Sequence, residues 1–398
     1  MTITQAVCLV GGRGTRLGAL TDRTPKPLLE VGGRPFLDYL VHEARRFGLT
    51  RLLLLSGYQS GEIERRYAGR RFGQLTVEVL PEPTPAGTAG ALRVAADRLD
   101  ETFFLLNGDS YFDFNWLLLA KADGDWTLHA ALARGIAGDR YGRVQLDGGR
   151  VRGFQEKGAS EEPINAGIYL ARRKLLHDIK AIPCSLEREV LPRLAERGEL
   201  LGTAARGAFI DIGVPQDFER AQQLLPAFMH RPAAFLDRDD GYVHKAEDIV
   251  WIDGAIETVR WLNEMGFYVF VITNQGGVAH GYYEERHVHE LHDWMQREMQ
   301  RHGAHIDAFE HCPFHPDGVV ERYKQESELR KPQPGMILKL QREWTTDPAR
   351  SFVVGDRDSD VAAAIAAGVA GYKFEGGNLL EFVKRRIGSA RQSERPQR

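Results

Sequence analysis

Two groups of residues have types and spacing suited to chemistry on phosphates. The first begins with a glycine-rich run, in which Gly11, Gly12 and Gly14 are followed by Thr15 and Arg16. Glycines let backbone N–H groups approach a phosphate chain because no Cβ is in the way, and an arginine adds positive charge. The spacing matches neither the dinucleotide-binding pattern nor a Walker loop. A tight turn after a strand is therefore the alternative interpretation.

Lys26 stands between Pro25 and Pro27, about ten residues after this run. Prolines restrict the backbone on both sides, which favours a stiff extended segment. Such a segment could aim the ammonium group at a fixed phosphate. The alternative is a lysine in an exposed loop.

Asp109 closes the run 103–108, so we expect it at the carboxyl end of a strand. Ligands of open α/β sheets bind at such ends, and Mg²⁺ prefers carboxylates together with phosphate oxygens. Asp109 is therefore a candidate metal ligand, although a lone aspartate here could also cap a helix.

The second group begins with Asp237 and Asp239, two residues apart after an apolar run. Carboxylates this close repel each other unless a cation or a phosphoryl group lies between them. Thr273, Lys331 and Asp356 follow later in the chain, the first and last of them at the ends of apolar runs. The set favours a second phosphoryl-transfer site with Mg²⁺.

Strands that alternate with helices must position these residues. Short apolar runs at 6–10, 51–55 and 102–106 are each followed by a helix-like pattern, and the rhythm restarts at 233–236. This alternation predicts mostly parallel sheets in two tandem α/β domains. We place the domains at 1–228 and 232–386, with a seam near Pro226 and Pro232. Residues 387–398 are polar and basic and are predicted to be a disordered tail.

The composition excludes several classes of protein. The net charge of -3 argues against a nucleic-acid partner or an anionic membrane surface. No run of 18 apolar residues predicts a membrane span, and the start of the chain lacks the features of a signal peptide. Three cysteines far apart fit a reducing cytoplasm. A homo-oligomer is compatible with the sequence.

The segments GGRGTRLG and TPKPLLEVGGRPFLDYL resemble the sugar-1-phosphate nucleotidyltransferase family, over about residues 5–220. The resemblance implies a Rossmann-like domain with a mixed sheet, bound Mg²⁺, and attack of a sugar phosphate on the α-phosphate of a nucleoside triphosphate. It also implies roles for single residues. These are catalysis by Arg16 and Lys26, nucleotide binding by Gly11, Gly12, Gly14, Thr15, Glu82, Gly87 and Thr88, sugar and phosphate binding by Asn107, Glu156, Lys157 and Asn165, and metal binding by Asp109 and Asp211.

The order Asp-x-Asp, Thr, Lys, Gly-Asp resembles the haloacid dehalogenase (HAD) phosphatases, over about residues 233–380. The segments DGYVH, TNQGGVAHGYY and RKPQPG are similar to heptose 1,7-bisphosphate and histidinol-phosphate phosphatases within that superfamily. The implied roles are a nucleophile, Asp237, an acid and base, Asp239, a Mg²⁺ site of Asp237, Asp239 and Asp356, and substrate binding by Thr273, Asn274, Arg330 and Lys331.

The chain departs from these phosphatases in two places. They usually hold zinc with a C-x-H pair and a later C-x-C pair, but the second pair falls here on Ser327 and Leu329. Cys312 and His315 alone cannot complete a tetrahedral site, so we expect no zinc; a bound ion would need a substitute ligand such as His311 or Glu328. About six residues are also missing after Asp239, which could displace that side chain.

Together the resemblances imply a pair of linked steps. A phosphatase would remove the 7-phosphate of a heptose 1,7-bisphosphate, and a transferase would then activate the heptose 1-phosphate with GTP to give GDP-heptose. The alternative is an enzyme like mannose-1-phosphate guanylyltransferase, joined to a C-terminal domain that only binds a ligand or mediates assembly.

Overall fold

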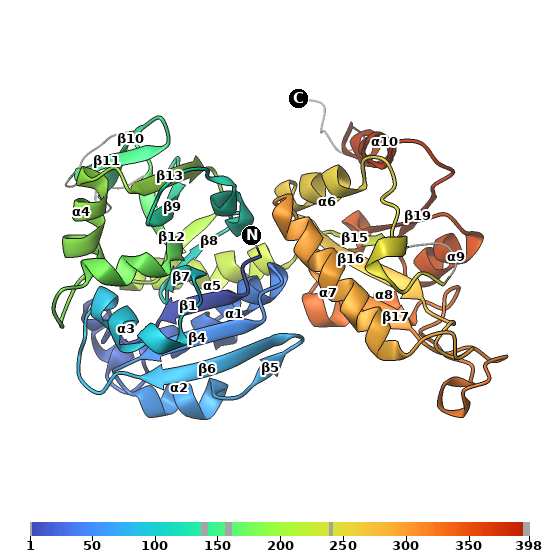
Figure 1. The fold of residues 1–398 in the computed structure, drawn as a ribbon, viewed down its shortest axis with the longest axis horizontal. Coiled ribbons are helices and arrows are strands. Elements are labelled where there is room, and N and C mark those ends of the chain that lie inside the picture. The colour runs from blue at the N-terminus through green and yellow to red at the C-terminus, as the bar shows by residue number, and fades with distance from the viewer. Residues whose placement is uncertain (1, 137–141, 156–160, 239–241, 393–398) are drawn as a thin grey trace. The chain divides into compact units, whose positions relative to one another are not determined.

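The computed structural model describes residues 2–136, 142–155, 161–238 and 242–392, with side chains up to residue 387. The chain divides into two compact units, 1–228 and 229–398 (Figure 1). None of the helices within these described ranges is long and apolar enough to cross a lipid bilayer.

The first unit is built on a mixed sheet, as the family resemblance implies, rather than on the mostly parallel sheet that the alternation of strands and helices predicts. At its centre β1 (Gln5–Leu9) pairs in parallel with β4 (Arg51–Ser56) and β7 (Thr102–Asn107), and β12 (Ile164–Arg172) runs antiparallel beside β7. In the described part of the unit the order is β10-β11-β13-β9-β12-β7-β1-β4-β6-β5. The other strands of this sheet are β5 (Arg71–Phe72), β6 (Leu75–Pro81), β9 (Leu128–Ala133), β10 (Arg143–Asp147), β11 (Arg150–Gln155) and β13 (Leu200–Ala205).

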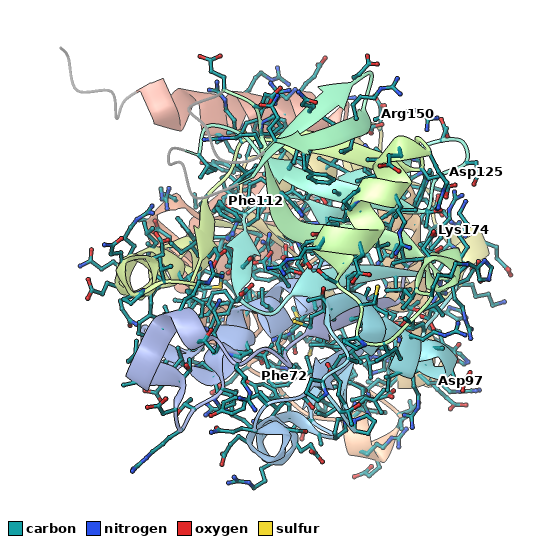
Figure 2. All side chains as sticks on the ribbon, turned by 90° about the vertical axis from the view of Figure 1, so that its left-hand side faces the viewer. Phe72, Asp97, Phe112, Asp125, Arg150 and Lys174 are labelled. Carbon is teal, nitrogen blue, oxygen red and sulfur yellow. The ribbon has the colours of Figure 1, made fainter. Side chains whose placement is uncertain are left out.

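Two short antiparallel pairs and the helices complete this unit. The pairs are β2 (Glu30–Val31) with β3 (Arg34–Pro35), and β8 (Ser110–Phe112) with β14 (Phe209–Asp211). The helices are α1 (Phe36–Arg46), α2 (Ser60–Tyr67), α3 (Thr88–Val94), α4 (Leu191–Glu196) and α5 (Pro215–Met229). Apolar side chains fill most of the interior, and many charged ones lie at the surface, such as Lys174, whose ammonium pairs with Asp125 at 2.5 Å (Figure 2).

Helix α5 continues through Pro226, where we expected helical sequence to give way. The ring of Pro226 packs closely against Gly32, where an added Cβ would lie 2.3 Å from the proline Cγ. The side chain of Gln222 also accepts a hydrogen bond from the Gly32 N–H at 3.0 Å. These tertiary contacts outweigh the low helix propensity of proline.

The second unit is a parallel five-stranded sheet in the order β17-β16-β15-β18-β19 over the residues described. Its strands are β15 (Ala233–Leu236), β16 (Tyr268–Asn274), β17 (Ala308–Cys312), β18 (Phe352–Gly355) and β19 (Ala370–Lys373). The fold class of two tandem α/β domains is therefore confirmed.

Helices cover both faces of this sheet, so successive residues of a strand enter different cores. Phe270 and Ile272 pack with α8 (Gly335–Trp344) and α9 (Asp358–Ala366), whereas Val269 and Val271 pack with α6 (Ala255–Glu264), α7 (Glu285–Arg301) and α10 (Leu379–Gln392). Burial on both faces explains why these strands read as continuous apolar runs.

Helix α10 runs from Leu379 to Gln392, so it extends past residue 387, where we predict that a disordered tail begins. Phe382 and Ile387 pack against the core, and residues 393–398 lie outside the described ones.

Candidate active sites

A cavity of about 600 Å³ opens at the carboxyl ends of β1, β4 and β7 in the first unit. It brings together most of the residues that the sequence singled out there. Among those that line it are Gly11, Gly12, Lys26, Glu82, Gly87, Thr88, Asn107 and Asp109.

One glycine of the cavity is required by its conformation and by a close approach of the backbone. Gly87 has a φ of 76°, and a Cβ there would lie 2.5 Å from the Cys184 carbonyl oxygen. At Gly11 an added Cβ would lie 2.8 Å from Oε1 of Glu82, so a larger residue there would displace the end of that side chain.

Gly14 and Thr15 form the turn out of the glycine run. Gly14 has left-handed backbone angles and precedes a 3₁₀ helix that begins at Thr15 and includes Arg16. The bend returns the chain toward Lys26, whose Cβ would lie 3.1 Å from a Cβ on Gly14.

Lys26 lies inside the unit and pairs with a carboxylate. Its side chain is only 8% exposed, and Nζ lies 2.5 Å from Oδ2 of Asp109. Pro25 is extended as expected, but Lys26 itself begins a 3₁₀ turn, so the prediction of an extended segment is wrong from this residue on. The turn directs the ammonium group inward.

Arg16 and Asp211 lie beside the same ammonium, around Gly213. A Cβ on Gly213 would lie 3.4 Å from Lys26 Nζ and 3.1 Å from an Arg16 nitrogen. Asp211 Oδ1 accepts from the Gly213 N–H at 2.6 Å. Asp211 lies on β14 and pairs with Ser110 on β8. Ser110 directly follows Asp109, so this pairing brings the two aspartates close together. The two carboxylates supply hard oxygen atoms of the kind that Mg²⁺ prefers.

Asn107 and Asn165 meet at the turn in β12. A Cβ on Gly167 would lie 2.9 Å from Asn107 Nδ2, and the Gly167 N–H donates to Asn165 Oδ1 at 3.1 Å. Glu156 and Lys157 lie outside the described residues.

Sequence reasoning missed two residues that line this cavity, Tyr58 and Glu187. The guanidinium of Arg13 lies 5.6 Å from the centre of the Tyr58 ring, and Thr88 donates to Glu187 at 2.8 Å. Tyr58 closely follows a predicted strand, which could have drawn attention to it. Glu187 has no such signal.

Three carboxylates converge at the carboxyl ends of the strands in the second unit. Oxygen atoms of Asp237, Asp356 and Asp360 all lie within 4.8 Å of one another. Lys331 neutralises part of this charge, since Nζ lies 2.5 Å from Asp237 Oδ1 and 2.7 Å from Asp360 Oδ1. Burial raises the pKa of Asp237 to about 6, while Lys331 acts in the opposite direction.

The neighbouring strand β16 fixes the position of Lys331. Asn274 donates to the Lys331 carbonyl and accepts from its N–H, both at 3.0 Å. The ammonium also donates to the Ile272 carbonyl at 3.2 Å. Thr273 is buried in the same stretch and accepts from Gln275 at 2.9 Å, whereas Asp239 lies outside the described residues.

The loop after β17 is packed by apolar contacts where zinc-binding phosphatases have their second pair of ligands. Leu329 and Phe314 pack against the core cluster that contains Cys312, and Cys312 Sγ lies 3.8 Å from the Phe314 carbonyl oxygen. Arg330 also donates to that oxygen, at 3.3 Å. The ring of His315 lies against His280, with ring centres 4.7 Å apart.

Comparison with known families gives a match in each of the two units. Residues 5–227 match the Nucleotidyl transferase family, and residues 328–378 match a HAD-hydrolase-like family. The chain therefore belongs to the nucleotidyl transferase family, and it joins this enzyme domain to a HAD-like phosphatase domain.

Individual relatives make the resemblance more specific. The chain is 49% identical, over 160 residues, to the D-glycero-beta-D-manno-heptose-1,7-bisphosphate 7-phosphatase of Rhodopseudomonas palustris. The aligned residues make up 39% of this chain and 89% of that protein. It is 43% identical, over 147 residues, to the D-glycero-alpha-D-manno-heptose-1,7-bisphosphate 7-phosphatase of Burkholderia mallei. Here the aligned residues make up 35% of this chain and 78% of that protein.

A solved structure resembles the other part of the chain. HddC from Yersinia pseudotuberculosis, complexed with GMP-PN, aligns with a TM-score of 0.51 and 28% identity, over 56% of this chain and all of that chain (100%).

We expect Asp109→Asn and Asp211→Asn each to lower pyrophosphate release by about 10²–10³-fold, because each removes a carboxylate that would hold the Mg²⁺ ion beside the transferring phosphate. Asp125→Asn, at an exposed aspartate of the same unit, is the control and should retain wild-type turnover. Near-wild-type turnover in both site variants would contradict the assignment, provided that circular dichroism shows an intact fold.

Lys26→Ala should also lower turnover or raise the KM for the substrates, since it removes the ammonium beside Asp109. Lys174→Ala removes a half-buried lysine of the same unit, whose ammonium pairs with Asp125, and should change neither parameter. Unchanged steady-state kinetics in Lys26→Ala would show that this ammonium does not contact the substrates.

Proposed function

We propose that the chain converts a heptose 1,7-bisphosphate into GDP-heptose. The second unit removes the 7-phosphate, and the first unit transfers the guanylyl group of GTP to the remaining 1-phosphate. The observation that supports this most strongly is the presence on one chain of both families, one similar to HddC and the other 49% identical to a heptose bisphosphate phosphatase. The product of the phosphatase step is the substrate class of the transferase step.

In the transfer step, an oxygen of the sugar 1-phosphate attacks the α-phosphorus of GTP. The bond from that phosphorus to the bridging oxygen breaks, and pyrophosphate leaves. Backbone N–H groups of the glycine run hold the triphosphate, and Arg16 and Lys26 offset the charge that develops. Asp109 and Asp211 hold Mg²⁺, which when bound adds further positive charge beside the reacting phosphate.

In the phosphatase step, a carboxylate oxygen of Asp237 attacks the phosphorus and the bond to the sugar oxygen breaks. Asp239 protonates that oxygen and later takes a proton from the water that hydrolyses the aspartyl-phosphate. Lys331 and Thr273 hold the phosphoryl oxygens. Mg²⁺ at Asp237, Asp239 and Asp356, when bound, neutralises part of their charge.

Glu82 supports guanine as the base. Its Oε2 accepts from the Ala86 N–H at 3.0 Å, and its Oε1 lies close to Gly11 in the cavity wall. A carboxylate only accepts hydrogen bonds, and guanine offers two adjacent donors, N1–H and the N2 amino group. Uracil offers one donor on the corresponding edge, so a carboxylate here favours guanine.

Pyrophosphate release with each of the four nucleoside triphosphates and a panel of sugar 1-phosphates tests this assignment. We expect the highest kcat/KM with GTP and heptose 1-phosphate. Glu82→Gln should lower kcat/KM for GTP by about tenfold or more, because a hydrogen bond to a charged group is lost, while leaving the weaker nucleotides less affected. Equal loss with every nucleotide would place Glu82 in a structural role.

Phosphate release from heptose 1,7-bisphosphate tests the second unit. Wild type should release one phosphate per sugar, and Asp237→Asn should reduce release to background because it lacks the nucleophile. Background release from both proteins would mean that this domain only binds a ligand or mediates assembly. A mixture of Asp109→Asn and Asp237→Asn proteins should make GDP-heptose from the bisphosphate, since each supplies the step that the other lacks.

A further inference from the structure

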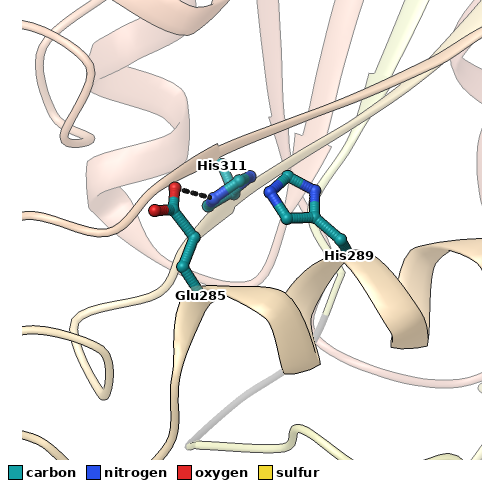
Figure 3. Close-up of side chains that lie close together, drawn as sticks. All are labelled: Glu285, His289 and His311. Carbon is teal, nitrogen blue, oxygen red and sulfur yellow. Dashed lines mark hydrogen bonds and ion pairs between the residues drawn. The ribbon is translucent and has the colours of Figure 1, made fainter. Parts of the chain in front are cut away.

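Three side chains that neither proposed reaction uses form a compact cluster in the second unit. Glu285 and His289 lie one turn apart on α7, and His311 projects toward them from β17 (Figure 3). Each side chain offers a ligand atom, and these atoms all lie within 4.8 Å of one another. The Asp237 carboxylate is not part of this set.

Contacts among the three side chains, and with one neighbour, hold the possible ligand atoms in place. Nε2 of His311 lies 3.0 Å from Glu285 Oε1, and the rings of His289 and His311 lie 5.1 Å apart at 84°. The hydroxyl of Tyr323 donates to the second carboxylate oxygen, Oε2, at 2.7 Å. Outer hydrogen bonds of this kind orient a carboxylate ligand.

Charge and exposure also suit a cation. A carboxylate offers a cation an anionic oxygen ligand, and the side chain of Glu285 is 33% exposed. His289 is exposed, and the side chain of His311 is 11% exposed. An ion can therefore enter from solvent at His289 and meet partly buried ligands behind it.

A second Glu–His pair, at the C-terminal end of the same helix, is an ordinary ion pair with which the cluster can be compared. Glu298 and His302 have the same spacing, and their side chains lie 3.3 Å apart. They belong to neither of the groups of three ligands that the described residues form. At the first pair, His311 supplies the third ligand from another element.

We propose that Glu285, His289 and His311 bind one divalent transition-metal ion of the Zn²⁺ class. Two imidazoles and one carboxylate form a set typical of zinc and poorly suited to Mg²⁺, which prefers oxygen ligands. The ion fastens the first turn of α7 to the end of β17. Through Tyr323, the same site also contacts the loop that leads to Lys331.

This inference departs from the sequence expectation of a protein without zinc. That expectation considered the loop around Cys312, where Ser327 and Leu329 replace thiolates. His311 was foreseen as a substitute ligand for that loop, whereas the structure pairs it with α7 instead.

The test uses the full-length chain, freed of metal with a chelator and then titrated with Zn²⁺ in excess Mg²⁺. Wild type should bind one Zn²⁺ per chain. His289→Ala and His311→Ala should each weaken binding by at least about 100-fold, since loss of even an outer partner costs 10–100-fold. Tyr323→Phe should weaken it by about tenfold, and His302→Ala, the matched control, should bind like wild type.

Co²⁺ provides a second measurement that does not depend on either enzyme activity. The wild-type complex should show d–d absorption without a sulfur-to-cobalt charge-transfer band, as expected for nitrogen and oxygen ligands. His289 is exposed, so its alanine variant keeps the test valid if His311→Ala fails to fold.

Three results would overturn the proposal. These are a wild type that binds no stoichiometric Zn²⁺, binding that survives His289→Ala, and binding that Cys312→Ser abolishes. Metal binding is measured without any sugar phosphate, so its failure is distinct from a failure of the phosphate-release assay.

Discussion

A buried lysine that pairs with carboxylates is the interaction on which both sites depend. Lys26 is 6% exposed and pairs with Asp109, and Lys331 is 5% exposed and contacts Asp237 and Asp360. Carboxylates gathered at strand ends repel each other and lose hydration, and an ammonium among them offsets both effects. Removal of either lysine would take away the ammonium that pairs with these carboxylates.

The backbone around each lysine explains how a long flexible side chain is held inside. Lys26 lies between two prolines at the start of a 3₁₀ turn, and Lys331 precedes Pro332 and pairs reciprocally with Asn274. These residues restrict the backbone at each lysine, so less conformational entropy is lost when the side chain forms its ion pair. Both sites in this way hold a positive charge beside their carboxylates.

The sequence predicted the elements better than the contacts between them. Strand limits such as those of β7 and β16 follow from apolar runs, because these strands are buried on both faces. The pairing of Lys26 with Asp109 joins residues 83 positions apart, and no local pattern encodes it. The cluster around Glu285 was missed for a related reason: a Glu and a His four residues apart resemble any exposed helix face, and the third ligand comes from another element.

The order of strands in the second sheet affects how the chain folds as it is synthesised. Strand β15 is the first strand of this unit along the chain and lies in the middle of the sheet, where Ala234 pairs with Val269 on one side and with Phe352 on the other. In the first sheet, β1 finds both neighbours by residue 107, since Leu9 pairs with Asn107. The second neighbour of β15 follows at a similar distance along the chain, since Ala234 pairs with Phe352. In both units the first strand therefore keeps one edge unpaired until a strand roughly a hundred residues later has left the ribosome, and an unpaired strand edge is a template for aggregation.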